Sequence, residues 1–409
     1  MEDLIVRPIY LWAFQTNRKQ LNLLFPFCSE KQPIMSYSIY DVIINTNQRS
    51  DLLMKSHLAV ILSKKLVGNM RYPRKHIQMI LSQQHYFQNI QCVNSLEDNF
   101  SIINSIAFHP TFPILAIGGK SKNNFGYAKL CCLSSDGLLS YYFPKLIDYS
   151  YVTNLLSIAF HPILPILATG KNDKTAKIWQ LSLDGSNPIC ISSIKEHSTV
   201  KVLSVVFHPT APILATVYSD EVVLWRLSQD GSVQQKNNCI TILESNCSSV
   251  AFHPSAPIIA IGKNDCTIKL WRLSSDWLIN TCIATLVGHI GQVTSVAFHP
   301  TEPILATASK DKTAKLWRLS HDDSTANCIA TLIGHTGSIR SVAFYPKAPI
   351  LATGSSDNTA KLWLISPDGT RTTCLATLAH SGSVRCVAFH PTASILATGG
   401  KNEYAKLWK

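Results

Sequence analysis

The chain has 409 residues, of which 46% are hydrophobic and only 15% charged, and this composition excludes an intrinsically disordered protein. Its 12 cysteines are too few for a disulfide-stapled scaffold, and the formal net charge is +12. The N-terminus is acidic where a secretory signal is basic, and no apolar run reaches the ~20 residues that span a bilayer. These features predict an intracellular protein, cytoplasmic or nuclear, with reduced thiols and no membrane segment.

Residues 1–87 form the first predicted domain, which is basic and has no visible repeat. It contains 11 basic and 5 acidic residues, so half of the net charge lies in a fifth of the chain. One helix is predicted from a cap at Ser50 or Asp51 to Gly68, and a second after Pro73. The domain is therefore expected to be partly helical.

Three alternatives remain open for this first domain. The stretch 40–66 is similar to the start of a BTB/POZ domain, through an Asp-Val strand and a helix that carries His57, Ala59 and Leu62. An F-box is a weaker alternative, and either resemblance would imply a substrate receptor of a ubiquitin ligase. The basic segment 64–76 allows a nucleic-acid-associated factor, although such segments are more often solvated helix ends.

From residue 88 to the end the sequence repeats, and these residues form the second predicted domain. The string Phe-His-Pro begins at six positions, and a Phe-Tyr-Pro variant begins at Phe344. Neighbouring copies lie 45 to 52 residues apart. The six are Phe108, Phe160, Phe207, Phe252, Phe298 and Phe389. Seven units of about 45 residues are typical of a repeat fold whose units stack to share a core.

Each unit contains the pattern of four short strands. In one complete unit the strands are predicted at 295–298, 303–309, 314–319 and 328–332, and a tight polar turn lies at 310–313. Four short strands cannot bury a core alone, whereas seven such sheets arranged radially can. The sequence therefore indicates an all-β ring.

The repeat resembles the WD-repeat β-propeller family. The resemblance depends on the Gly-His pairs at 288–289 and 334–335, on the aspartates of the polar turns, and on a Trp that ends the third strand. It implies a seven-bladed propeller of four-stranded antiparallel blades, preceded by the short helical segment. These tryptophans are Trp179, Trp225, Trp271, Trp317, Trp363 and Trp408.

The end of the chain predicts how the ring closes. Trp408 and Lys409 complete a third strand, so the seventh blade lacks its outer strand. Counting back from Phe108 by the spacing of the complete units reaches Cys92. We expect residues 90–96 to supply the missing strand, because an open ring would leave two unpaired sheet edges.

The resemblance implies that each blade is buttressed by a hydrogen-bonded His, Ser or Thr, Asp and Trp. A buried Trp N–H needs an acceptor and a buried Asp needs donors, so the set is physically reasonable. The second unit has no His, and the fourth has Ile261 in place of the Thr. The candidates are His289, Thr307, Asp311 and Trp317; His335, Thr353, Asp357 and Trp363; His197, Thr216, Asp220 and Trp225; and His380, Thr398 and Trp408.

Other His and Cys residues also follow the repeat. The Phe-His-Pro histidines could form a ring that binds metal, but a repeated turn residue is the simpler interpretation because neighbouring blades hold equivalent atoms too far apart. The outer-strand cysteines are interpreted as small buried residues. With no phosphate loop, HExxH or G-x-S-x-G present, no metal, no cofactor and no enzymatic activity are predicted.

Two positions in each unit predict a binding face. In the family, partners commonly contact the residue five after the His and the residue directly before the turn Asp. The first position is occupied here by Thr294, Arg340 and Arg385. The second is occupied by Lys310, Ser356 and Lys401. The four cations form an arc on the last three blades and suit an acidic or phosphorylated peptide. The alternative is a solvated rim, which is also expected for the lysines two before each Trp. We predict a monomeric, non-enzymatic scaffold that binds other proteins.

Overall fold

The computed structural model divides the chain into two units, Met1–Asn89 and Ile90–Lys409. It describes residues 90–409 except 97, 135–138, 144–146, 151–152, 183–186, 195–199, 234–238, 243, 275–279, 322–324 and 402–403. The predicted helices, the BTB- or F-box-like stretch and the basic segment 64–76 lie outside the described residues.

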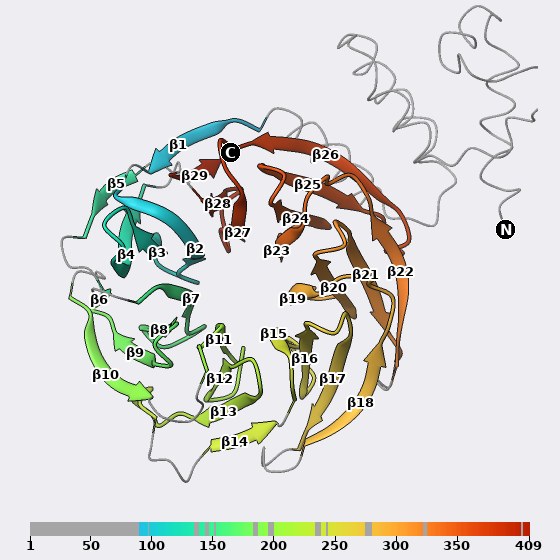
Figure 1. Cartoon of the computed structure of the whole chain (residues 1–409), viewed down its shortest axis with the longest axis horizontal. Helices are drawn as coiled ribbons and strands as arrows, with labels where there is room; N and C mark the ends of the chain where they lie inside the picture. The colour runs from blue at the N-terminus through green and yellow to red at the C-terminus, as the bar shows by residue number, and fades with distance from the viewer. Residues whose placement is uncertain are drawn as a thin grey trace, which may run out of the picture. The chain divides into compact units, whose positions relative to one another are not determined.

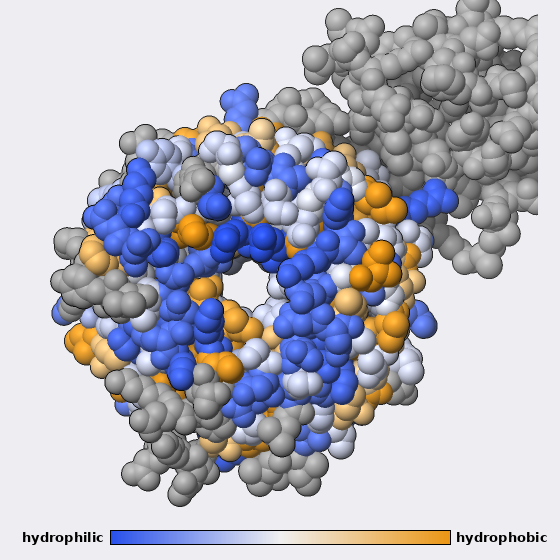
Figure 2. All heavy atoms as spheres, viewed as in Figure 1, coloured by the Kyte–Doolittle hydropathy of each residue, from blue (hydrophilic) through white to orange (hydrophobic). Residues whose placement is uncertain are grey.

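Seven antiparallel sheets are arranged around a central channel (Figure 1), which confirms the predicted seven-bladed propeller. The sheet order places the first strand of each unit beside the channel and the fourth at the rim. On the face drawn in Figure 2, hydrophilic side chains surround much of the channel mouth.

The blades follow one another in chain order, and we number them one to seven. Blade one differs because its outer position is divided between two strands that both pair with β4. It consists of β2 (Phe100–Phe108), β3 (Ile114–Ser121), β4 (Gly126–Leu133), β5 (Leu139–Tyr142) and β6 (Ile147–Ser150). Blade two consists of β7 (Leu155–Phe160), β8 (Ile166–Lys171), β9 (Ala176–Gln180) and β10 (Ile189–Ile194).

The next four blades each have the simple four-stranded order. Blade three is β11 (Ser204–Phe207), β12 (Ile213–Val217), β13 (Val222–Arg226) and β14 (Cys239–Ile242). Blade four is β15 (Cys247–Phe252), β16 (Ile258–Lys263), β17 (Ile268–Leu273) and β18 (Asn280–Leu286). Blade five is β19 (Val293–Phe298), β20 (Ile304–Ser309), β21 (Ala314–Leu319) and β22 (Ala326–Leu332). Blade six is β23 (Ile339–Phe344), β24 (Ile350–Ser355), β25 (Thr359–Ile365) and β26 (Thr372–Ala379).

Blade seven joins the two ends of the described chain. Its strands β27 (Val384–Phe389), β28 (Leu396–Gly400) and β29 (Ala405–Trp408) are followed in the sheet by β1 (Cys92–Leu96). The strand expected over residues 90–96 thus pairs antiparallel with β29. Gln91 and Lys409 extend the ladder by exchanging backbone hydrogen bonds of 2.9 and 3.0 Å.

The core lies between neighbouring blades. Every residue of the second strand is buried in most blades, as in β20 and β24, because both faces of each sheet are covered by adjoining sheets. One cluster, for example, packs Ile304 and Leu316 of blade five against Val342 and Leu351 of blade six. A single blade could not bury these residues, which explains why the unit must be repeated.

Serine hydroxyls of the inner strands connect one blade to the next. Ser157 Oγ accepts the N–H of Val205 at 3.0 Å, and the same bond recurs between other neighbouring blades. The other serines are Ser105, Ser249, Ser295 and Ser341. Cys386 occupies this position in blade seven, where a hydrogen bond of 2.9 Å from Arg385 Nη1 to Asn104 Oδ1 links blade seven to blade one.

Candidate functional site

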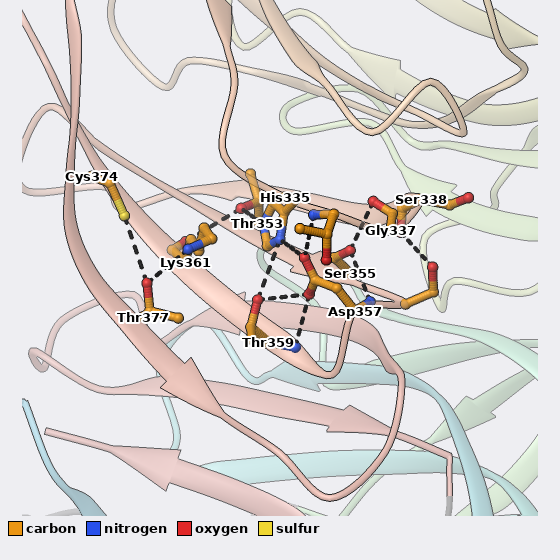
Figure 3. Close-up of polar contacts among 12 residues, drawn as sticks. His335, Gly337, Ser338, Thr353, Ser355, Asp357, Thr359, Lys361, Cys374 and Thr377 are labelled. Atoms are coloured by element: carbon orange, nitrogen blue, oxygen red, sulfur yellow. Dashed lines mark hydrogen bonds and ion pairs between the residues drawn. The ribbon is translucent and has the colours of Figure 1, made fainter.

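Blades five and six contain the complete hydrogen-bonded set (Figure 3 shows blade six). His335 Nδ1 lies 2.7 Å from Asp357 Oδ2, and His335 Nε2 lies 2.7 Å from Thr353 Oγ1. Trp363 Nε1 donates to Thr353 Oγ1 at 2.9 Å. In blade five, His289, Asp311, Thr307 and Trp317 repeat these contacts at 2.7 to 2.9 Å.

The order of donors in this set follows from chemistry. A carboxylate only accepts, so His335 Nδ1 donates to Asp357, and the other nitrogen of the neutral ring accepts from Thr353. Burial lowers the pKa of His335, and Asp357 partly opposes that shift. Burial alone would raise the pKa of Asp357, but hydrogen bonds from Thr359, His335 and the Thr336 N–H bring it to about 2. The set is thus a neutral imidazole beside a carboxylate, and the Thr353 hydroxyl that it binds is fully buried against Trp363.

Blades three and seven retain parts of the set. Trp225 Nε1 donates to Thr216 Oγ1 at 2.8 Å, while Asp220 is exposed and His197 lies outside the described residues. In blade seven, Trp408 donates to Thr398 at 2.8 Å, and His380 Nε2 lies 3.1 Å from Thr398 Oγ1.

In three other blades a carboxylate stands where the His is expected. In blade two, Asp148 accepts from Thr169 at 2.8 Å and forms ion pairs with Lys171 at 3.1 Å and Lys177 at 2.6 Å. Trp179 Nε1 still donates to Thr169 at 3.0 Å. The buried carboxylate is balanced by two ammonium groups, as an ion in a low-dielectric site requires.

Blade four uses a glutamate in the same way. Glu244, 6% exposed, pairs with Lys263 at 3.0 Å and with Lys269 at 2.6 Å. Because Ile261 replaces the Thr, the buried Trp271 Nε1 has no hydrogen-bond acceptor among the described residues. In blade one, Lys129 pairs with Asp98 at 2.9 Å.

These pairs correct the interpretation of the lysines two before each Trp as a solvated face. Lys177 and Lys269, and Lys129 at the matching position of blade one, compensate buried or half-buried carboxylates, whereas Lys315 and Lys361 donate hydrogen bonds to threonine hydroxyls of the outer strand. Sequence reasoning missed the carboxylates because Asp98 and Glu244 lie in loops of variable length, and Asp148 lies in β6, a strand that the other units lack. One available signal was Lys171 and Lys263 at a strand position that is serine in blades five and six.

The Phe-His-Pro histidines stabilise turns and connect blades. His109 Nδ1 accepts the N–H groups of Thr111 at 3.2 Å and Phe112 at 3.0 Å, and the other five make the same bonds. Each ring also packs against the Phe of the next blade at 4.8 to 5.0 Å, and His390 closes the ring on Phe108. Burial lowers the pKa of His109 and of His208 to about 4, so both rings are neutral at pH 7.

The inner strands line a cavity of about 510 Å³. Its walls are apolar residues such as Phe108, Phe160 and Phe389, with Ser157, Ser204 and Ser249 between them. The lining contains no acid, His, Lys or Cys. Within the described residues, no three His, Cys, Asp or Glu side chains are grouped to hold a metal ion. The described part of the chain also contains no helix with the length and hydropathy needed to cross a bilayer.

The predicted partner-contacting residues separate into two groups. Arg385 is half-buried and bonded to Asn104, and Thr294 Oγ1 donates to the Ile339 carbonyl at 2.6 Å, so both serve contacts between blades. Ser356 is half-buried, and its hydroxyl donates to the Ser338 carbonyl at 3.2 Å.

The remaining three residues, Lys310, Arg340 and Lys401, are exposed, and none forms an ion pair with a described carboxylate. The pKa of Arg385 is lowered mainly by burial and next by the positive charge of Arg340. The two guanidinium groups are therefore close enough to repel each other. Arg340 therefore lies near a positive charge that is already fixed by the Arg385–Asn104 hydrogen bond.

The outer-strand cysteines are not buried as predicted. Five are exposed on the rim, and Cys239 is partly exposed. Each of the five lies opposite the Trp of the third strand at a β-bulge, with its thiol directed to a carbonyl two residues on. They are Cys92, Cys190, Cys282, Cys328 and Cys374. The outer strand has no blade beyond it, so only its inward-facing residues can be buried.

Comparison with known proteins gives one family. The sequence model of the WD domain, G-beta repeat, matches six segments that together span just over half of the chain. The segments are residues 149–180, 188–226, 237–272, 280–318, 326–363 and 372–409. No curated protein matches the chain. The six matches end at the third strands of blades two to seven, and blade one, which has Cys131 in place of the Trp, is not matched.

Proposed function

The chain belongs to the WD40-repeat family, and from this we propose that it is a non-enzymatic interaction scaffold that binds other proteins. Propellers of this family typically bind protein partners. The observation that supports a particular face is the set of exposed cations Lys310, Arg340 and Lys401, which form no ion pair within the described part of the chain. Three other lysines of the repeat are used to neutralise carboxylates, so cations without such a partner are available for a ligand.

We propose an acidic or phosphorylated peptide as the ligand of this face. A guanidinium binds carboxylate and phosphate oxygens with two parallel hydrogen bonds. Arg340 is exposed, so its guanidinium is accessible to such a ligand. Its neighbour Arg385 adds positive potential while remaining bonded to Asn104. The ring geometry supports a propeller that acts as a monomer, because β1 of the same chain covers the edge of β29 and no strand from a second copy is needed to complete blade seven.

Charge reversal tests this proposal. The double variant Lys310→Glu and Arg340→Glu changes exposed residues only, and it should lose the proteins that the tagged full chain captures from a lysate, as measured by quantitative mass spectrometry. Arg385 is left intact because its loss would disturb the seam between blades seven and one.

The matched control is Lys122→Glu with Lys174→Glu, which makes the same change of charge on exposed turns of blades one and two. It should retain the captured proteins. Equal capture by both double variants would show that the cations of blades five and six do not bind partners.

A further inference from the structure

Three large apolar side chains project into solvent from the loops that lead into blades five and six. Val287 is 74% exposed, Ile290 91% and Ile333 77%. Val287 and Ile333 are equivalent residues, each directly before a Gly-His pair. In blade seven the equivalent of these two is Ala379, and Ser381 is the equivalent of Ile290, so the loop into blade seven does not repeat these large apolar residues.

Hydrogen bonds fix the loops that carry these side chains. The Ile290 N–H donates to Asp311 Oδ2 at 3.1 Å, and the Thr336 N–H donates to Asp357 Oδ2 at 2.9 Å. The Gly291 carbonyl accepts from Ser309 Oγ at 2.7 Å, and the Gly337 carbonyl accepts from Ser355 Oγ at 3.0 Å. A partner that covers Val287, Ile290 and Ile333 therefore does not have to order the backbone beneath them, which favours tight binding.

The loops that carry the apolar side chains adjoin the residues that carry the exposed cations: the Lys310 N–H donates to the Gln292 carbonyl at 2.9 Å, in the loop of Ile290. Ser338 of the loop that begins at Ile333 directs its hydroxyl to the Lys310 carbonyl at 3.5 Å, so this loop touches the turn of blade five. Arg340 follows two residues later at the start of β23. We call Val287, Ile290, Ile333, Lys310 and Arg340 the mixed surface.

This inference rests on the proposed function and specifies its partner. We infer that the mixed surface binds a peptide segment that carries both carboxylate or phosphate groups and large apolar side chains. The charge of Lys310 and Arg340 is complementary to the acidic groups, and the aliphatic side chains require apolar residues to cover them. A nucleic acid provides no aliphatic side chain, and a binding site for one would need more concentrated positive charge. Burial of each apolar residue is expected to contribute about tenfold to hundredfold in affinity.

The test is a selection of random 12-residue peptides displayed on phage against the immobilised full chain. The enriched peptides should combine Asp or Glu with Leu, Ile, Phe or Trp. The best peptide is then synthesised and titrated by fluorescence anisotropy at low and high salt. The variant Val287→Ser, Ile290→Ser and Ile333→Ser should weaken binding at least tenfold at both salt concentrations, whereas Lys310→Glu with Arg340→Glu should weaken it chiefly at low salt.

The matched control is Ile163→Ser with Ile189→Ser, since these side chains are 75% and 55% exposed on blade two. It should bind the peptide as the wild type does. If the selected peptides are acidic but lack apolar residues, and the triple serine variant binds them as tightly as the wild type does, this inference is overturned. The proposed function would still stand. Peptides bound equally by the charge-reversal variant would overturn the proposed function. A third outcome is that no peptide is enriched, and that vesicles of phosphatidylcholine and phosphatidylserine bind the wild type but not the triple variant. This result would assign the surface to a membrane and overturn the inference.

Discussion

Thr353 is a fully buried threonine whose hydroxyl serves two neighbours. It donates to His335 Nε2 and accepts from Trp363 Nε1. Replacement by valine keeps the volume but leaves both nitrogens unpaired in the core. Thr353→Val should lower the free energy of unfolding by about 1–3 kcal/mol, measured by urea denaturation. The control Thr377→Val removes an exposed hydroxyl that binds Lys361, and it should change stability by less than ~0.5 kcal/mol. Equal effects of the two variants would contradict the buttress role.

Glu244 is the residue on which blade four depends for charge balance. Glu244→Gln leaves the ammonium of Lys263, 7% exposed, with Asp265 alone, so the free energy of unfolding should fall by about 3–5 kcal/mol. Glu302→Gln, an exposed residue, makes the same chemical change and should have almost no effect. A Glu244→Gln protein as stable as the wild type in urea would show that this carboxylate does not hold blade four together.

At the scale of elements, closure of the ring depends on β1, a strand that is distant in sequence from the other three strands of blade seven. Leu96 is 2% exposed and packs in the cluster between blades seven and one. Leu96→Ala should lower the free energy of unfolding by about 2–5 kcal/mol. It should also speed hydrogen exchange of the β29 amides, because β29 then loses its partner more often.

Leu286→Ala provides the comparison for this element. Leu286 is 3% exposed at the equivalent position of β18, which is continuous in sequence with the other strands of blade four. A similar loss of stability is expected, but exchange at β29 should stay as in the wild type. If both variants exchange at β29 alike, β1 has no special part in closing the ring.

The seam between blades seven and one differs from the other junctions. Cys386 cannot repeat the serine bond, and Arg385 instead donates to Asn104. A residue predicted from its position to contact partners is thus used within the fold, because the last blade must be joined to the first by side chains specific to that junction.

The whole molecule should respond to acid through its ring of histidines. Burial holds the pKa of His109 and His208 near 4, against about 6.5 in the unfolded chain. These residues stabilise the fold fully above pH 6.5, and this contribution is lost as the pH falls from 6.5 to 4, since the unfolded chain binds more protons. Near pH 5, each decrease of one pH unit should lower the free energy of unfolding by about 3 kcal/mol through these two residues together.

Urea denaturation at a series of pH values measures this slope. The variant His109→Asn keeps an acceptor for the turn N–H groups but does not titrate, so the slope should decrease by about 1.4 kcal/mol per pH unit. If the variant and the wild type show the same pH dependence of the free energy of unfolding, His109 does not take up a proton on unfolding between pH 6.5 and 4.

The sequence by itself determined the number of blades, the strands, the turns and the Thr–Trp pairs, because each depends on residues at fixed spacing within one unit. It also indicated the closing strand over residues 90–96, since the count of strands was one short. Only the tertiary structure revealed Asp148 and Glu244 as substitutes for His, the exposure of the rim cysteines and the use of Arg385 in the seam. These features depend on which side chain reaches a neighbouring blade and on which face of an outer strand no blade covers, and such contacts between units leave no periodic signal within one unit.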